Sequence, residues 1–175
     1  MRRLAPLALA GLLAGCGFHP LYGVPDTPGG TMQGTLRSIY VEPVSERLGY
    51  QLRNALIDFL DAKGDPVGAV YRLRVTLSQK SEAIGVQSQT APGGVTQTAI
   101  TRYNDRLVAE YELLDAKTGA IVAKGTETGL SSYNVLSSPY ATLAVQQDAD
   151  RRAAEDIADR IRVDIAVHFA QQAKQ

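Results

Sequence analysis

The chain has 175 residues, and its 18 lysine and arginine residues are balanced by 18 aspartate and glutamate residues. This balance provides no net basic field of the kind that nucleic-acid-binding proteins use, so nucleic acid is not an expected partner. A single cysteine excludes an intrachain disulfide framework, and the length is that of one domain with its own hydrophobic core.

The first residues predict an export signal. A short basic segment precedes an apolar stretch, residues 4–13, which is too short to span a membrane but suits the core of a signal peptide. It ends in Leu13-Ala14-Gly15-Cys16, which matches the bacterial lipobox. We predict a signal peptide over residues 1–15 and lipidation of Cys16. Gly17, in place of the aspartate that often marks retention in the inner membrane, favours the outer membrane. The alternative is that Cys16 is an ordinary small residue in a signal sequence cleaved elsewhere.

Glycine and proline are frequent in residues 16–35, which are predicted to form a lipidated flexible tether ahead of a single domain over residues 36–175. The domain is expected to open with a strand over Leu36–Val41. Ser45 is then placed to cap a helix that Gly64 ends. The helix is predicted to bury one stripe at helical spacing: Leu48, Leu52, Ala55, Leu56, Phe59 and Leu60.

Three strands follow, because the apolar residues now alternate with polar ones. The first covers Val70–Ser78 and is expected to run on through Val86. Residues Gln87–Thr98 are rich in Ser, Thr, Gln, Gly and Pro and predict a long flexible hairpin loop. A return strand follows, and Ala120–Leu130 forms the next antiparallel strand after a turn. The residues predicted to face the core are Tyr71, Leu73, Val75, Leu77, Tyr103, Leu107, Ala109, Tyr111 and Leu113.

A second, longer helix is predicted to begin at Ser137-Ser138-Pro139. Its apolar stripe consists of Ala154, Ile157, Ala158, Ile161, Ile165 and Phe169. Each helix has one apolar face and each strand has one apolar and one polar face. The economical packing is an α+β two-layer sandwich, with two helices on one face of a four-stranded, mostly antiparallel sheet.

The sequence offers little support for catalysis. The two histidines, His19 and His168, do not form a cluster with metal-ligand spacing, and no nucleotide-binding motif is present, so neither a metal nor a cofactor is expected. Glu110 and Glu112 lie two residues apart on one strand face, so geometry allows an acid–base pair, but a solvated strand face that carries two glutamates is far commoner. We therefore predict a binding or assembly protein rather than an enzyme.

Basic residues on the polar faces of the strands are candidates for binding an anionic ligand such as a phosphorylated glycolipid, because guanidinium groups hold phosphate through paired hydrogen bonds. The alternative is that they only keep the sheet soluble, offset by nearby glutamates. The residues concerned are Arg72, Arg74, Lys80, Arg102, Arg106 and Lys124.

The run Cys16-Gly17-Phe18-His19-Pro20-Leu21-Tyr22-Gly23 resembles the start of proteins of the lipopolysaccharide-assembly lipoprotein family LptE, in particular the alphaproteobacterial type. The resemblance continues in Tyr40-Val41-Glu42-Pro43, in the segments Arg72–Val86 and Thr101–Asp115, and in the terminal helix of alternating charge.

This resemblance implies an outer-membrane lipoprotein that forms a plug inside the β-barrel LptD and helps that barrel to assemble. Together the two insert lipopolysaccharide into the outer leaflet, and Arg102, Arg106 and Lys124 are the positions here that would contact it. The alternatives are an accessory lipoprotein of another lipid-transport system of the cell envelope, a periplasmic enzyme tethered to the membrane, and a peptidoglycan-binding lipoprotein.

Overall fold

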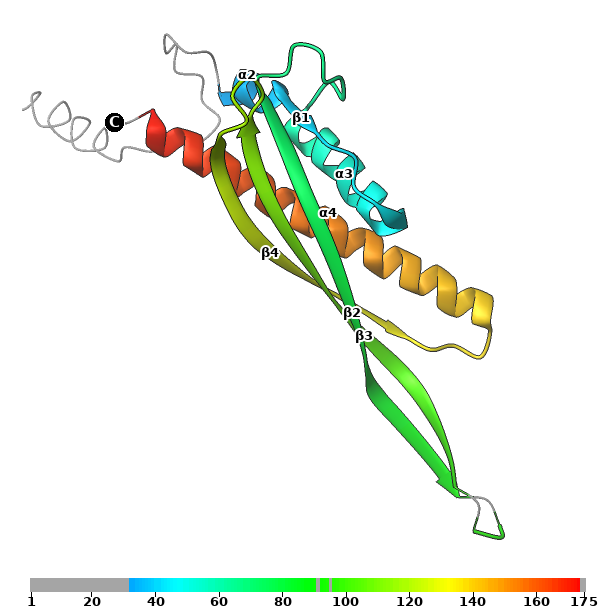
Figure 1. Ribbon diagram of the computed structural model, residues 1–175. Coiled ribbons are helices and arrows are strands. Elements are labelled where there is room, and N and C mark those ends of the chain that lie inside the picture. Colours follow the sequence, from blue (N-terminus) through cyan, green and yellow to red (C-terminus); the bar gives the residue numbers. More distant parts are fainter. Residues whose placement is uncertain (1–31, 91, 95, 174–175) are drawn as a thin grey trace, which may run out of the picture. The chain divides into compact units, whose positions relative to one another are not determined.

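Figure 1 shows the order and arrangement of the helices and strands in the described part of the chain. The computed structural model describes residues 32–173 apart from residues 91 and 95. The predicted signal peptide, the predicted lipidation at Cys16 and the first part of the predicted tether lie outside these residues. The elements are α2 (Met32–Arg37), β1 (Ile39–Val41), α3 (Glu46–Leu60), β2 (Tyr71–Thr90), β3 (Thr96–Asp115), β4 (Ile121–Asn134) and α4 (Pro139–Gln172).

The four strands form one sheet in the order β1-β2-β3-β4, in which β1 is parallel to β2 and the other neighbours are antiparallel. Helices α3 and α4 pack against each other, and α4 lies along β4. Buried side chains from both helices and from β1, β2 and β3 form one hydrophobic cluster. The predicted α+β fold is thereby confirmed, with the short helix α2 as an additional element.

Helix α3 buries a leucine stripe against the sheet. Leu48, Leu52, Leu56 and Leu60 recur every four residues and are all buried, as expected for one face of a helix. The predicted stripe is wrong at Phe59, whose side chain is 42% exposed. Helical spacing places Phe59 at nearly the same angle as Leu48, so its direction around the helix does not explain its exposure; in the last turn of α3 it is Leu60 that faces the hydrophobic cluster.

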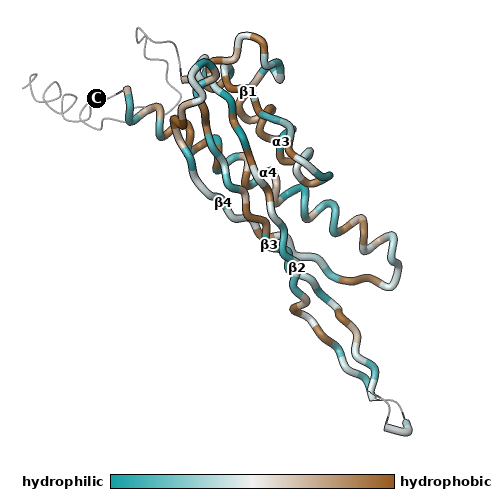
Figure 2. The backbone as a smooth tube through the Cα atoms, viewed as in Figure 1, coloured by the Kyte–Doolittle hydropathy of each residue, from teal (hydrophilic) through white to brown (hydrophobic). Residues whose placement is uncertain are grey.

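Helix α4 begins where the sequence predicts. Ser138 is its N-cap and accepts a hydrogen bond from the backbone N–H of Ala141, and Pro139 occupies the first turn. Ile157, Ile161 and Ile165 are fully buried. The colouring of Figure 2 shows apolar stretches where the strands run beside the helices.

Two glycines of β4 allow α4 and β3 to approach closely. A Cβ atom at Gly129 would lie 2.8 Å from Cδ1 of Ile157 and 3.2 Å from the backbone oxygen of Ala153, both on α4. A Cβ atom at Gly125 would lie 2.7 Å from the ring of Tyr111 on β3. Gly129 therefore lets α4 lie close to the sheet, whereas Gly125 leaves room for the Tyr111 ring of the neighbouring strand.

The start of the domain differs from the prediction. Residues 32–37 form the helix α2, whereas the sequence placed them partly in an irregular tether and partly in a strand over Leu36–Val41. Only Ile39–Val41 are a strand. Leu36 is buried from the helix, and the backbone N–H and hydroxyl of Ser38 both bond to the carbonyl of Thr35, which turns the chain into β1.

The predicted loop Gln87–Thr98 is also wrong, because β2 continues to Thr90 and β3 resumes at Thr96. Val86 lies opposite Ile100, and the hydroxyls of Ser88 and Thr98 are 3.4 Å apart across the strands. Serine, threonine and glutamine need no buried face to form a ladder of backbone hydrogen bonds, so the absence of an apolar alternation was not evidence against strands. We call this two-stranded end, residues 85–101, the ribbon.

Strand β2 has an open edge over most of its length. β1 pairs only with Tyr71, Arg72 and Leu73, so among the described residues nothing pairs with the outer edge of β2 from Val75 to Thr90. A β-bulge between Ala83 and Val86 interrupts the register there.

None of the helices in the described part of the chain has the length and apolar character needed to span a membrane.

Candidate ligand-binding face of the sheet

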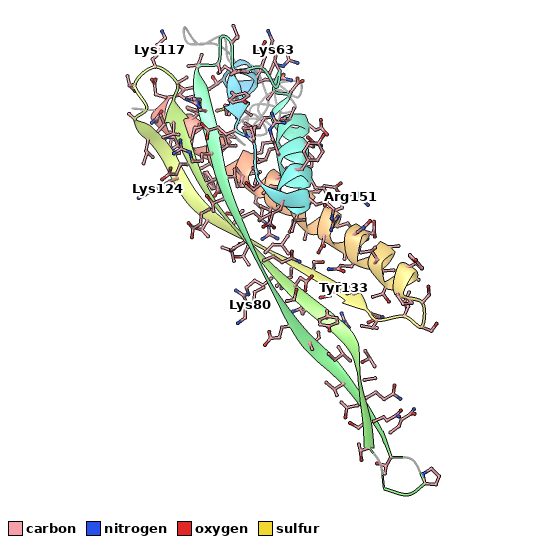
Figure 3. The ribbon with its side chains drawn as sticks, turned by 45° about the vertical axis from the view of Figure 1, so that its right-hand side comes forward. Lys63, Lys80, Lys117, Lys124, Tyr133 and Arg151 are labelled. Atoms are coloured by element: carbon pink, nitrogen blue, oxygen red, sulfur yellow. The ribbon has the colours of Figure 1, made fainter. Side chains whose placement is uncertain are left out.

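The sheet face that points away from the helices carries most of the charged residues of the strands. Because strand side chains alternate, the burial of Leu107, Ala109 and Tyr111 directs Arg106 and Glu110 to this outer face. In Figure 3, Lys80 and Lys124 point from the strands to the side opposite the helices. The predicted division into a core face and a polar face is thus confirmed.

Two of the candidate basic residues are already paired. Arg72 lies 2.9 Å from Glu42, and Arg74 lies 3.1 Å from Glu42 and 3.6 Å from Glu112. These contacts join β2 to the segment after β1 and to β3. The positive charges of Arg72 and Arg74 are therefore offset within the protein. This weakens the case for these two arginines as ligand-binding residues.

Lys124 borders a shallow hollow of about 500 Å³ on the outer face. It lies opposite Glu112 in the register and forms no ion pair with other described residues. Glu110 and Glu112 also line this hollow, together with Arg74 and Thr76. The two glutamates that could have formed an acid–base pair thus lie in a mixed-charge, solvent-facing surface.

Lys80 and Arg106 lie directly opposite each other on β2 and β3. Like charges at directly opposed positions destabilise a sheet, and neither side chain forms an ion pair with other described residues. Leu130 of β4 is the next residue across, and its side chain is 60% exposed. We call Lys80, Arg106 and Leu130 the basic rung. It combines two uncompensated cations with an exposed apolar side chain.

Arg102 lies elsewhere, at the base of the ribbon opposite Asn134. It lines a second hollow of about 310 Å³ between the strands and the start of α4, to which Tyr133 and Arg152 also contribute. Arg106 and Lys124 share the outer face, but six residues of strand, about 20 Å, separate their rungs. The three predicted contact residues are therefore not one cluster. Lys80 is the residue that the structure adds beside Arg106.

A buried polar cluster lies where the strands leave the helix layer. Asp105 and Asp150 are 0% and 1% exposed. The Ser131 hydroxyl donates a hydrogen bond to Asp150 (3.0 Å), and the Gln79 amide donates one to Asp105 (2.9 Å). Burial raises the pKa of Asp150; the Ser131 hydrogen bond opposes this shift, and the negative charge of Asp105 adds to it.

The sequence prediction missed this cluster. Asp105 stands two residues before the core residue Leu107, so the alternation of the strand places its side chain inside. That inward position was the available signal.

A second polar contact joins β3, β4 and α4. The Tyr111 hydroxyl donates to the Asp164 carboxylate at 3.2 Å, and Glu127 is hydrogen-bonded to the same carboxylate. Burial, reinforced by Asp164, raises the pKa of Tyr111 to about 12. His168 bonds to Gln172 on α4 at 3.0 Å, and no group of three metal-ligating side chains exists among the described residues; His19 lies outside them.

The described elements form a two-layer α+β sandwich in which a long α-helix packs on a mixed sheet with a polar outer face. The family model described as LptE, lipopolysaccharide-assembly, matches residues 36–165. The chain therefore belongs to the LptE family, which assigns it to lipopolysaccharide assembly.

Solved structures share this fold. A Caulobacter crescentus protein described as a lipoprotein is 31% identical, with a TM-score of 0.61 over 79% of this chain and 96% of its own. Rare lipoprotein B from Shewanella oneidensis is 14% identical, with a TM-score of 0.50 over 77% of this chain and 98% of its own, and shows likeness of fold alone. No curated protein sequence matches the chain.

Proposed function

We propose that the protein is an outer-membrane lipoprotein that plugs the β-barrel LptD, helps that barrel to assemble, and with it delivers lipopolysaccharide to the outer leaflet. Family membership supports the role in lipopolysaccharide assembly. In this proposal residues 1–15 are a signal peptide, Cys16 carries the lipid, and the segment that follows links the lipid to the folded body. No catalytic or cofactor-dependent step is part of the proposal.

The ribbon is the observation that carries the plug proposal. No charged residue occurs from Ala83 to Thr101, although 21% of the whole chain is charged. The ribbon extends past Asn134, the last β4 residue paired with β3, and its side chains, residues 91 and 95 left aside, are almost all exposed on both faces. An uncharged polar surface suits the polar interior of a large β-barrel better than a lipid-facing one. A carrier of bare lipid would instead need an apolar groove.

The basic rung supports contact with the cargo. Lys80 and Arg106 supply two cations for a phosphate group, and the exposed Leu130 supplies an adjacent apolar contact for the same amphipathic molecule. We propose that this rung is the main contact for lipopolysaccharide, with Lys124 and Arg102 as separate, weaker contacts.

The plug proposal is tested by affinity purification of the tagged, full-length lipoprotein from outer membranes in mild detergent. Wild type should bring down one large β-barrel in near one-to-one amount. A variant in which Asn-Gly replaces residues 87–99 keeps Val86 opposite Ile100 through a two-residue turn. This variant should retain the urea unfolding midpoint of wild type, because it removes no core residue, and should recover much less barrel.

Full recovery of the barrel by the shortened variant would refute the role of the ribbon. If wild type brought down no barrel but an inner-membrane transporter instead, the plug proposal would fail. The alternative, an accessory lipoprotein of another lipid-transport system, would then stand.

Cargo contact is tested by measuring lipopolysaccharide binding of the purified lipoprotein. The double variant K80A/R106A should bind at least about tenfold more weakly, because hydrogen bonds to charged groups contribute about 1.5–3 kcal/mol each. The matched control K63A/K117A removes the same charge from two exposed lysines distant from the rung (Figure 3). An equal loss of binding in both double variants would show that only the net charge of the protein matters.

A further inference from the structure

Four carboxyl groups lie at the contact between α4 and the sheet, in two pairs. In the first pair, Asp105 of β3 and Asp150 of α4 are both almost completely buried, at 0% and 1% exposure. Ser131 lies between them, since it is the cross-strand partner of Asp105 and donates its hydroxyl to Asp150. Two buried carboxyl groups, contributed by different layers of the fold, thus lie on either side of one serine.

Few cations and hydrogen-bond donors surround the two carboxyl groups of this pair. Among the described residues, the one cation paired with Asp150 is Arg47 of α3, at 3.4 Å, and its side chain is 51% exposed. Asp105 receives the Gln79 amide on Oδ2, while its buried Oδ1 has no hydrogen-bond partner in the described part of the chain. Tyr133 lies close enough for both carboxylates to raise its pKa, after the larger effect of its own burial. Two ionised carboxylates here would leave one negative charge without an opposite charge.

The second pair is Glu127 of β4 and Asp164 of α4, whose carboxyl groups lie within hydrogen-bonding reach of each other. Two such carboxyl groups repel each other when both are ionised, whereas a proton on one of them allows a hydrogen bond between them. Tyr111 of β3 also donates to Asp164. On α4, Arg160 favours the ionised form of Glu127 and Asp156 opposes it, but Arg160 is itself held by Asp156 at 2.5 Å.

The direction of the pH effect follows from these environments. Burial comes first among the causes that raise the pKa of Asp150 and of Glu127, and the partner carboxylate of each adds to it. A raised pKa in the folded state means that folding takes up protons. The resulting stabilisation is complete below the ordinary pKa values of 3.8 and 4.5, and it is lost as pH rises through the raised values.

We propose that the contact between α4 and the sheet is a proton-dependent lock. Asp150 and Glu127, each beside a second carboxyl group, take up protons when α4 seats on the sheet, so acidification tightens the helix on β3 and β4 and alkaline pH loosens it. The lock joins all the layers of the domain, since β2, β3, β4, α3 and α4 each contribute a group to it.

The test is urea unfolding of the purified full-length lipoprotein in detergent micelles between pH 4 and pH 8, a range that begins near the ordinary pKa values of the two groups. Each proton taken up on folding changes the folding equilibrium constant by up to about tenfold per pH unit. Wild type should therefore become more stable as pH falls over this range. D150N and E127Q each replace the carboxyl group whose pKa is raised by an amide that donates as the protonated acid does, so each should reduce the slope, and the double variant should nearly abolish it.

The matched control is E155Q, which removes a carboxylate from an exposed ion pair with Arg151 on the same helix and should leave the slope unchanged. If the substituted chains fail to fold, ¹³C NMR of the side-chain carboxyls in wild type gives the answer directly, because two carboxyl resonances should titrate above the usual range. A flat or opposite pH profile would overturn the proposal, and so would ordinary titration of every carboxyl. Stabilisation of wild type at pH 8 by Ca²⁺, lost in D150N, would replace the proton by a bound cation and would also overturn it.

Discussion

The close approach of α4 to β4 makes Gly129→Ala the sharpest test of the packing. The added Cβ would lie 2.8 Å and 3.0 Å from two side-chain carbons of Ile157, and 3.2 Å from the backbone oxygen of Ala153. Ile157 is fully buried, so its side chain cannot swing away without disturbing the core, and the backbone of α4 would have to shift.

Overpacking of this kind destabilises by about 1–3 kcal/mol, and replacing glycine gains back roughly 0.4–1 kcal/mol through the unfolded chain. We expect a net loss of roughly 1–2 kcal/mol, measured as a lower urea midpoint at unchanged m-value. Leu130→Ala, one residue away but on the exposed side, should have little effect. The loss of stability thus depends on whether the substituted residue faces the helices or the solvent.

A double variant separates the steric explanation from a general loss of stability. Ile157→Val removes the Cδ1 atom that the new methyl group meets, and alone it should destabilise by about 0.5–1.5 kcal/mol. Combined with Gly129→Ala, it should relieve part of the clash, so the loss in the double variant should be smaller than the sum of the two single losses. Strict additivity, or a Gly129→Ala protein as stable as wild type, would refute the reasoning.

Three further predictions concern single side chains. Lys80→Glu places a carboxylate opposite Arg106 and should stabilise the protein by about 0.2–1 kcal/mol in urea while weakening lipopolysaccharide binding; a loss of stability would contradict the like-charge interpretation. Tyr111→Phe removes the donor to Asp164 and should destabilise by about 0.5–1.5 kcal/mol; absorbance titration should also lose a phenol that ionises only near pH 12, and an unchanged titration curve would contradict the assignment. Ser131→Ala leaves Asp150 without its hydroxyl donor and should destabilise by about 1–3 kcal/mol at pH 7 by thermal unfolding, whereas an unchanged midpoint would show that the hydroxyl is dispensable.

Alternation and helical spacing predicted the parts of the fold that a single hydrophobic core determines. Leu73 and Leu107 are buried because every second strand residue faces the helices, and Ser138-Pro139 starts α4 because capping is a local property. The ribbon could not be found in this way. It has no buried face, and its strands are held by pairing between residues such as Val86 and Ile100 that are distant from any core.

The candidate site was predictable only in part. Residue type and the alternation of strand side chains placed Arg106 and Lys124 on one face of the sheet. They could not show that Arg74 is neutralised by Glu42 and Glu112 from neighbouring segments. Register was also needed to bring Lys80 opposite Arg106, since one residue of slip would turn one of the two to the other face.

The open edge of β2 and the uncharged ribbon affect how readily the protein aggregates while no partner is bound. A strand edge without neighbours is a template for pairing with another copy, and proteins usually protect such edges with charges or bulges. Lys80, Glu82 and the bulge near Gly85 do so for the first half of the edge, but no charge guards the half that ends at Thr90. Chains without a bound partner should therefore aggregate through the ribbon, which favours prompt pairing of this edge after synthesis.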